Sequence, residues 1–240
     1  MYFAIIGDIV DSRKILGRNE VQIQMQQVLN NVNNTYDKYI ASNFTITLGD
    51  EFQGLLSSAS KIFEIIDFIR YSLYPINLRL GIGIGDMSTS FQRSTSIGSD
   101  GPAYWAARQA INTIHNDDSK SSSIRIEADM SKGLSNQAVA STWQQTLTQT
   151  INVINSTLVV CQQQEASWTR LQAGFVAKLI KEYKYGDNGK FVQVHIANAF
   201  NMSPQLVSNK IKMTGIKKYV AVRINLSNII QNICSEITVH

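Results

Sequence analysis

The chain has 240 residues, of which 44% are hydrophobic, and a formal net charge of +4. This length and apolar content are enough to bury a core in one large and one small domain. With only 3 prolines and 14 glycines, the composition excludes a largely disordered chain. No apolar run approaches the roughly 20 residues needed to cross a bilayer, so we expect no membrane contact.

The N-terminus leads directly into an apolar segment, without the basic stretch and cleavage site of a secretion signal. The two cysteines, Cys161 and Cys234, are far apart and lack the spacing of metal ligands. We therefore expect a cytoplasmic protein with two free thiols.

Charge is distributed unevenly along the chain. Residues 1–165 contain 12 Lys and Arg against 15 Asp and Glu, and residues 166–240 contain 10 against 3. The first of these segments therefore has a net charge of −3 and the second a net charge of +7. A basic C-terminal segment favours contact with a polyanion, although a solvated lysine-rich face has the same composition.

Strands and helices alternate in the first half of the chain. The apolar run at residues 2–8 is typical of a central strand buried on both faces. Apolar spacings of three and four predict helices, and short β-rich runs predict strands. The further predicted elements are a helix at 19–39, a hairpin at 44–48 and 52–56, a helix at 59–73, a strand at 76–84, a helix at 102–114 and a strand at 123–127.

This βαββαβ order predicts an α+β chain that begins with a ferredoxin-like palm domain. We place that domain at residues 1–135, a linker helix at 136–165 and a small all-α domain at 166–240. Within the palm, Gly81, Gly83 and Gly85 alternate along one strand and are expected to admit a neighbouring backbone closely.

Two carboxylates lie where apolar strands end, each directly after a glycine: Asp8 and Asp50. Mg²⁺ in proteins is typically held by one or two carboxylates together with substrate phosphates. We therefore assign Asp8 and Asp50 as candidate Mg²⁺ ligands. The alternative is that the two aspartates only cap a strand end and a hairpin turn. The neighbouring candidates for ligand or phosphate binding are Ile9, Asp11, Ser12, Arg13 and Glu51.

These segments, together with Gly101-Pro102-Ala103-Tyr104-Trp105-Ala106-Ala107-Arg108, resemble the palm domain of class III nucleotidyl cyclases. The Gly49-Asp50-Glu51-Phe52 turn is also similar to that of diguanylate cyclases. The resemblance implies a catalytic role for Arg108 in stabilising developing charge. The chain departs from the cyclase pattern at Tyr104, where that family has an Asn, and at residues 45–47, which lack its base-selecting Lys. We therefore expect a degenerate cyclase-like domain that binds nucleotide without efficient cyclisation.

The basic segment carries a second pattern. A short helix is predicted at residues 190–200, followed by a turn. A second helix then begins with Ser203 as its N-cap and Pro204 as its first helical residue, and it ends near Gly215. This layout predicts a helix-turn-helix whose second helix contacts duplex DNA. Base edges would meet Gln205, Ser208, Asn209 and Lys212, and phosphates would meet Lys210, Lys217 and Lys218. A two-helix unit that binds a protein partner is the alternative.

With both halves considered, the whole chain resembles the SatD family of bacterial proteins. Our first hypothesis is a cytoplasmic DNA-binding regulator whose palm-like domain senses a nucleotide or other phosphorylated ligand, with Mg²⁺ as a candidate cofactor. The second is a Mg²⁺-dependent nucleotidyl-transfer enzyme of the cyclase type, a phosphorus–oxygen lyase, with a regulatory tail. A structural interaction protein is the third. Because cyclase sites lie at dimer interfaces and the helix at 139–160 has an apolar face, we expect a homodimer.

Overall fold

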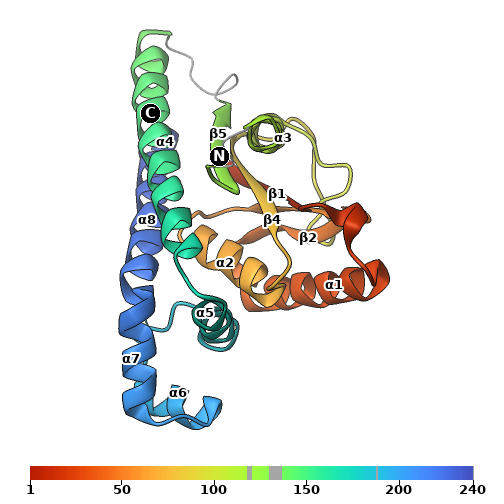
Figure 1. The fold of residues 1–240 in the computed structure, drawn as a ribbon. Coiled ribbons are helices and arrows are strands. Elements are labelled where there is room, and N and C mark those ends of the chain that lie inside the picture. Colours follow the sequence, from red (N-terminus) through yellow and green to blue (C-terminus); the bar gives the residue numbers. More distant parts are fainter. Residues whose placement is uncertain (118–120, 130–136, 188, 240) are drawn as a thin grey trace.

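The computed structural model describes residues 1–117, 121–129, 137–187 and 189–239. These residues form an α+β fold with a five-stranded sheet and eight α-helices, as the sequence predicts (Figure 1). The strands are β1 (Tyr2–Ile9), β2 (Ile40–Leu48), β3 (Glu51–Leu56), β4 (Leu78–Gly85) and β5 (Ile124–Asp129). The helices are α1 (Arg18–Thr35), α2 (Ile62–Ser72), α3 (Pro102–Asn116), α4 (Gln137–Ala166), α5 (Arg170–Tyr183), α6 (Gln193–Phe200), α7 (Pro204–Thr214) and α8 (Ile216–Val239).

The sheet has the strand order β2-β3-β1-β4-β5. Strand β1 is antiparallel to both β3 and β4, and only β5 runs parallel to its neighbour, β4. Helices α1 and α2 cover one face of the sheet, and α3 covers the other (Figure 1). The sheet, with Asp8 near the end of β1, therefore lies between a layer formed by α1 and α2 and a layer formed by α3.

Two predicted boundaries in the sheet domain differ from the observed ones by four residues. The helix expected to reach residue 39 ends at Thr35, and a single 3₁₀ turn, Asp37–Tyr39, follows it. Strand β2 begins at Ile40, four residues before its predicted start, and its pairing with β3 contains register shifts. After Ile40, the next three residues, Ala41, Ser42 and Asn43, are weak β-formers, so cross-strand pairing rather than propensity extends the strand.

The glycines of β4 bring α3 against the sheet, as predicted. A Cβ at Gly81 or Gly83 would overlap the backbone of Ala107 or Ala103. The small residues on both sides thus let the helix and strand backbones approach closely. This contact determines where the polar residues at the far end of α3 lie.

Helices α4 and α8 lie side by side along the edge of the sheet (Figure 1). The buried side chains Leu147, Ile151, Ile154 and Leu158 of α4 join the main core. The apolar face of this helix is therefore covered within the same chain, and its exposure is not a reason to expect a dimer. The predicted domain boundary at residues 135–136 lies outside the described residues. No helix among the described residues is long and apolar enough to cross a bilayer.

A buried ionic cluster, formed by Asp67, Arg70, Glu165 and Arg223, joins α2, α4 and α8. The Arg70 guanidinium donates to both oxygens of Glu165, at 3.1 and 2.6 Å. Arg223 is 1% exposed; its Nε lies 3.5 Å from Asp67 Oδ2 and its Nη2 lies 3.3 Å from Glu165 Oε1.

Tyrosine hydroxyls complete this cluster. Tyr185 donates to Asp67 over 2.6 Å and Tyr219 donates to Glu165 over 2.7 Å. Burial alone would raise the pKa of Glu165, but Arg70 and Arg223 lower it to about 2. Glu165 is therefore ionised throughout the physiological pH range, and its pairs with Arg70 and Arg223 fix the C-terminal helices on the sheet domain.

The ionic cluster generates a stability prediction. Arg223→Met leaves two buried carboxylates to share the single guanidinium of Arg70, so we expect the free energy of unfolding to fall by roughly 3–5 kcal/mol. Urea denaturation would measure the change. Lys218→Met, an exposed change on the same helix, is the matched control and should alter stability by less than about 0.5 kcal/mol. Equal effects of the two substitutions would contradict the role given to the cluster.

Candidate functional sites

The first site is a row of charged residues across three adjacent strands. Asp8 of β1 lies opposite Glu51 of β3 on one side and opposite Arg79 of β4 on the other. Residues directly opposite in antiparallel strands share one face of the sheet, so the three side chains lie together. That face is the one covered by α3.

Helix α3 contributes two further side chains to the charged row, Arg108 and His115. Arg108 forms a bidentate pair with Glu51, with nitrogen–oxygen distances of 2.6 and 2.8 Å. His115 Nε2 lies 2.9 Å from Asp8 Oδ2, and Arg79 Nε lies 3.2 Å from Asp8 Oδ1. The hydrogen bonds from Arg108 lower the pKa of Glu51. The charged row thus contains two carboxylates, and each already has a partner: Arg108 for Glu51, and Arg79 and His115 for Asp8.

Asp50 has a different set of partners. Its side chain accepts a hydrogen bond from the Ser12 hydroxyl, and its carbonyl accepts one from the Ile9 amide over 3.1 Å. Together with Ile9, Ser12, Arg18 and Gly49 it lines a small recess beside the start of α1. The structure therefore brings Asp50 to the same end of the sheet as Asp8 but gives the two carboxylates separate partners.

The other predicted phosphate-binding residues are distributed around this end. Ile9 is buried, whereas Arg13 is exposed. Asp11 adopts a left-handed backbone conformation with φ of 53° and pairs with Lys14 at 3.3 Å on the surface. Of this group, Ser12 contacts the Asp50 carboxylate, and Ile9 contacts Asp50 through the backbone.

The charged row can be tested for its fit to Mg²⁺. Carboxylate oxygens are the correct donors for this hard cation, and Asp8 and Asp50 would hold it with Glu51 adjacent. Among the described residues, however, no group of three or more acidic, His or Cys side chains has metal-binding geometry. Because Asp8 forms an ion pair with Arg79 and a hydrogen bond with His115, the cation would have to compete with these partners.

Sequence reasoning missed Arg79 and His115. Arg79 interrupts an apolar strand at the position that pairs with Asp8. His115 follows Arg108 by seven residues, which is two helical turns, so both lie on the same face of α3. Tyr104, in contrast, is buried in the apolar cluster between α3 and the sheet. It contributes no side chain to the charged row.

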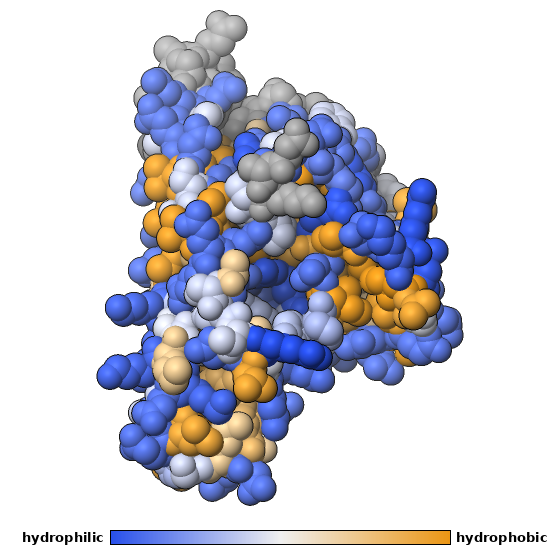
Figure 2. Space-filling model, viewed as in Figure 1, coloured by the Kyte–Doolittle hydropathy of each residue, from blue (hydrophilic) through white to orange (hydrophobic). Residues whose placement is uncertain are grey.

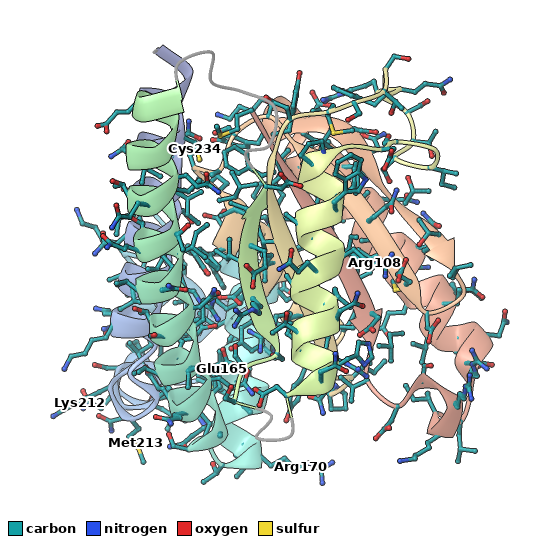
Figure 3. The ribbon with its side chains drawn as sticks, turned by 90° about the horizontal axis from the view of Figure 1, so that it is seen from above. Arg108, Glu165, Arg170, Lys212, Met213 and Cys234 are labelled. Atoms are coloured by element: carbon teal, nitrogen blue, oxygen red, sulfur yellow. The ribbon has the colours of Figure 1, made fainter. Side chains whose placement is uncertain are left out.

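The second site is the exposed face of α7. Ser203 caps this helix by accepting a hydrogen bond from the Leu206 amide over 3.2 Å, and Gly215 ends it with φ of 64°. Both caps are as predicted. Gln205, Asn209 and Lys212 are exposed along one side, and Lys212 lies at the periphery of the molecule (Figure 3).

The remaining predicted DNA contacts surround that side. Ser208 and Lys210 are half-buried, and the Lys210 ammonium lies 5.6 Å from the ring centre of Phe175. Lys217 and Lys218 are exposed on the first turn of α8. Of the ten Lys and Arg after residue 165, only Arg223 forms an ion pair within the described residues. The others leave this end of the molecule with uncompensated positive charge.

A family model described as the SatD family matches residues 2–230. The chain belongs to the SatD family. The match includes both the charged row and α7, so the two sites are parts of one SatD family unit. No curated protein matches the sequence.

Proposed function

We propose that this SatD family member is a DNA-binding regulator whose N-terminal domain binds a phosphorylated ligand. The observation that carries the proposal is α7, a capped helix whose exposed polar side is surrounded by unpaired cations. Helices α6 and α7 follow each other through a tight turn, α7 packs on α5 and α8, and Phe200 of α6 contacts Phe175 of α5, which supports a helix-turn-helix. In such a motif the second helix enters the major groove, and the lysines contact phosphates.

The strand order supports the assignment of the N-terminal domain. The strand order β2-β3-β1-β4, with each strand antiparallel to its neighbours, is the one expected of a ferredoxin-like palm. The charged row lies at one end of the central strand β1. Arg108 presents the planar guanidinium that recognises phosphate as readily as carboxylate. We propose that a phosphoryl group takes the place of Glu51 on Arg108, and that Mg²⁺ binds together with this ligand at Asp8 and Asp50.

A nucleotidyl-transfer enzyme of the cyclase type is the second candidate. The pairing of Arg108 with Glu51, next to Asp8, favours it, because an arginine beside acidic residues is suited to phosphoryl chemistry. The absence of a Lys in residues 45–47 and the burial of Tyr104 favour the sensor instead. Product formation from ATP or GTP with Mg²⁺ would support the enzyme, and saturable binding without turnover would support the sensor.

Substitutions on and beside α7 test DNA binding. Lys217→Ala and Lys218→Ala should each weaken binding to all DNA sequences. Each should also reduce the slope of log affinity against log salt concentration by about 1, because one phosphate contact fewer means that fewer counterions are released on binding. Gln205→Ala and Asn209→Ala should instead reduce the difference in binding free energy between specific and non-specific DNA sites by roughly 1–3 kcal/mol. Fluorescence anisotropy of labelled duplexes at several salt concentrations measures both.

Two controls accompany the DNA measurements. Lys38→Ala changes an exposed lysine in the 3₁₀ turn before β2 and should leave DNA affinity unchanged. Ser203→Ala removes the cap of α7 and should cost about 1 kcal/mol of stability. If the lysine substitutions at 217 and 218 behave like Lys38→Ala, the helix pair binds a protein partner and DNA binding is refuted.

The ligand site is tested at its carboxylates. Asp8→Asn or Asp50→Asn should weaken Mg²⁺-dependent binding of ATP or GTP more than tenfold, about 1.4 kcal/mol, because each removes a hard anionic donor. Isothermal titration calorimetry with and without Mg²⁺ measures the change. Asp37→Asn, at a surface ion pair with Arg93, is the matched control. Nucleotide affinity unaffected by both Asp8→Asn and Asp50→Asn would assign these residues a structural role only.

We further propose that the protein binds DNA as a homodimer. Two copies of α7 could then occupy successive major grooves about 34 Å apart. Light scattering at micromolar concentration, with and without duplex DNA, should give twice the chain mass. A mass of one chain in both conditions would refute the dimer and with it recognition of a palindromic site.

A further inference from the structure

A cavity of about 420 Å³ lies where α2, β4, α4 and α5 meet. It is separate from the charged row, since none of its lining residues belongs to that row. Its volume is within the range of small-molecule sites, which is about 300–1,000 Å³. On the face seen in Figure 2, several hydrophobic patches lie among hydrophilic residues. Surface hydropathy therefore does not single out the cavity, and its lining residues are needed to describe it.

The lining of the cavity indicates the chemistry of a ligand. Tyr74 and Trp168 supply aromatic surface, and Leu78 and Ala173 supply aliphatic surface. Asn77 adds a side-chain amide, whereas the Gln162 amide oxygen already accepts a hydrogen bond from the Ser123 amide. Aromatic walls beside an amide are suited to a planar ring whose edge carries hydrogen-bond donors and acceptors.

The charged residues of the cavity exclude a charged ligand. Its lining includes two ionic side chains, Arg70 and Glu165, which bond each other through two nitrogen–oxygen contacts. An anion or cation bound here would have to separate this pair, at the cost of leaving one partner buried and uncompensated. Glu165 extends from α4 at this junction (Figure 3). A neutral ligand leaves the pair intact.

We propose that this cavity is a binding site for an uncharged nucleobase-type ligand, a free base or nucleoside without phosphate. The site is independent of the proposed phosphorylated-ligand site and of DNA binding.

One wall of the cavity is joined directly to α7. The Trp168 indole donates to the Thr214 carbonyl at the end of this helix over 2.9 Å, and Gln164 donates to the same oxygen over 3.1 Å. Trp168 also packs on Tyr219 of α8, with ring centres 5.8 Å apart. A ring bound against Trp168 therefore restrains the C-terminal end of α7.

The binding experiment uses the full chain and adenosine, guanosine, cytidine and uridine as probes. Isothermal titration calorimetry should show saturable 1:1 binding of at least one nucleoside. Ala173→Phe fills the cavity and should weaken that binding at least tenfold. Ala221→Phe, the same change at an exposed position of α8, should leave it unchanged. Tyr74→Ser removes a partly exposed wall and gives a second variant if Ala173→Phe does not fold.

Two results would overturn the binding site. One is the absence of saturable binding by all four nucleosides up to about 1 mM. The other is nucleoside binding that survives both Ala173→Phe and Tyr74→Ser, because it would place the ligand elsewhere.

The connection to α7 has its own measurement. Nucleoside should slow amide hydrogen exchange at residues 212–215 in the unmodified chain. Trp168→Phe keeps an aromatic wall but loses the indole donor, so this variant should bind nucleoside while losing the protection. Protection that persists in Trp168→Phe, or that is absent from the unmodified chain, would refute the connection.

Discussion

The relative position of the two halves of this protein depends on one buried ionic cluster. Asp67 and Arg70 come from α2, Glu165 from the end of α4, and Arg223 from α8. Removing four charged groups from water is costly, and the cost is offset only while every partner is present. The cluster therefore selects a single docking of α8 against α2, which non-directional apolar packing would not specify as narrowly.

The same corner of the molecule gives the C-terminal helices their orientation. The indole of Trp168 and the amide of Gln164 both donate to the carbonyl of Thr214, the last residue of α7, which lies two residues after the exposed Lys212. A change in the docking of α4 or α5 would thus be transmitted to the proposed recognition helix through hydrogen bonds rather than through a flexible linker. This is the physical requirement for a regulator whose ligand and DNA sites are far apart in the sequence.

The charged row depends on a different constraint, the close contact between α3 and β4. Because alanines on α3 face glycines on β4, Arg108 and His115 are brought against Glu51 and Asp8. Each carboxylate is then neutralised within the chain. The phosphorylated ligand that we propose would have to displace these internal partners. Its affinity would then be the difference in free energy between its own contacts and the internal ones.

Local sequence was sufficient for the elements and their caps. Periodicity identified the strands and helices of the sheet domain, and Ser203, Pro204 and Gly215 marked both ends of α7, because capping and turn chemistry act within a few residues. The alternating glycines also predicted the close approach of a neighbouring backbone, which the structure identifies as α3. The long helix α8 was missed, since its polar and apolar residues give only a weak amphipathic pattern.

What the sequence could not determine is which side chains meet across long separations. Asp8 and Asp50 were identified from local motifs, but their partners, His115, Arg79 and Ser12, follow from strand register and helix docking. The buried cluster joins residues 67 and 223, and the apolar face of α4 is covered by β5 and α8 of the same chain. The sequence by itself determined the α+β class, the caps and the position of the charge. The tertiary structure alone decided the pairing of that charge, because burial and electrostatic compensation depend on contacts between segments that no local pattern specifies.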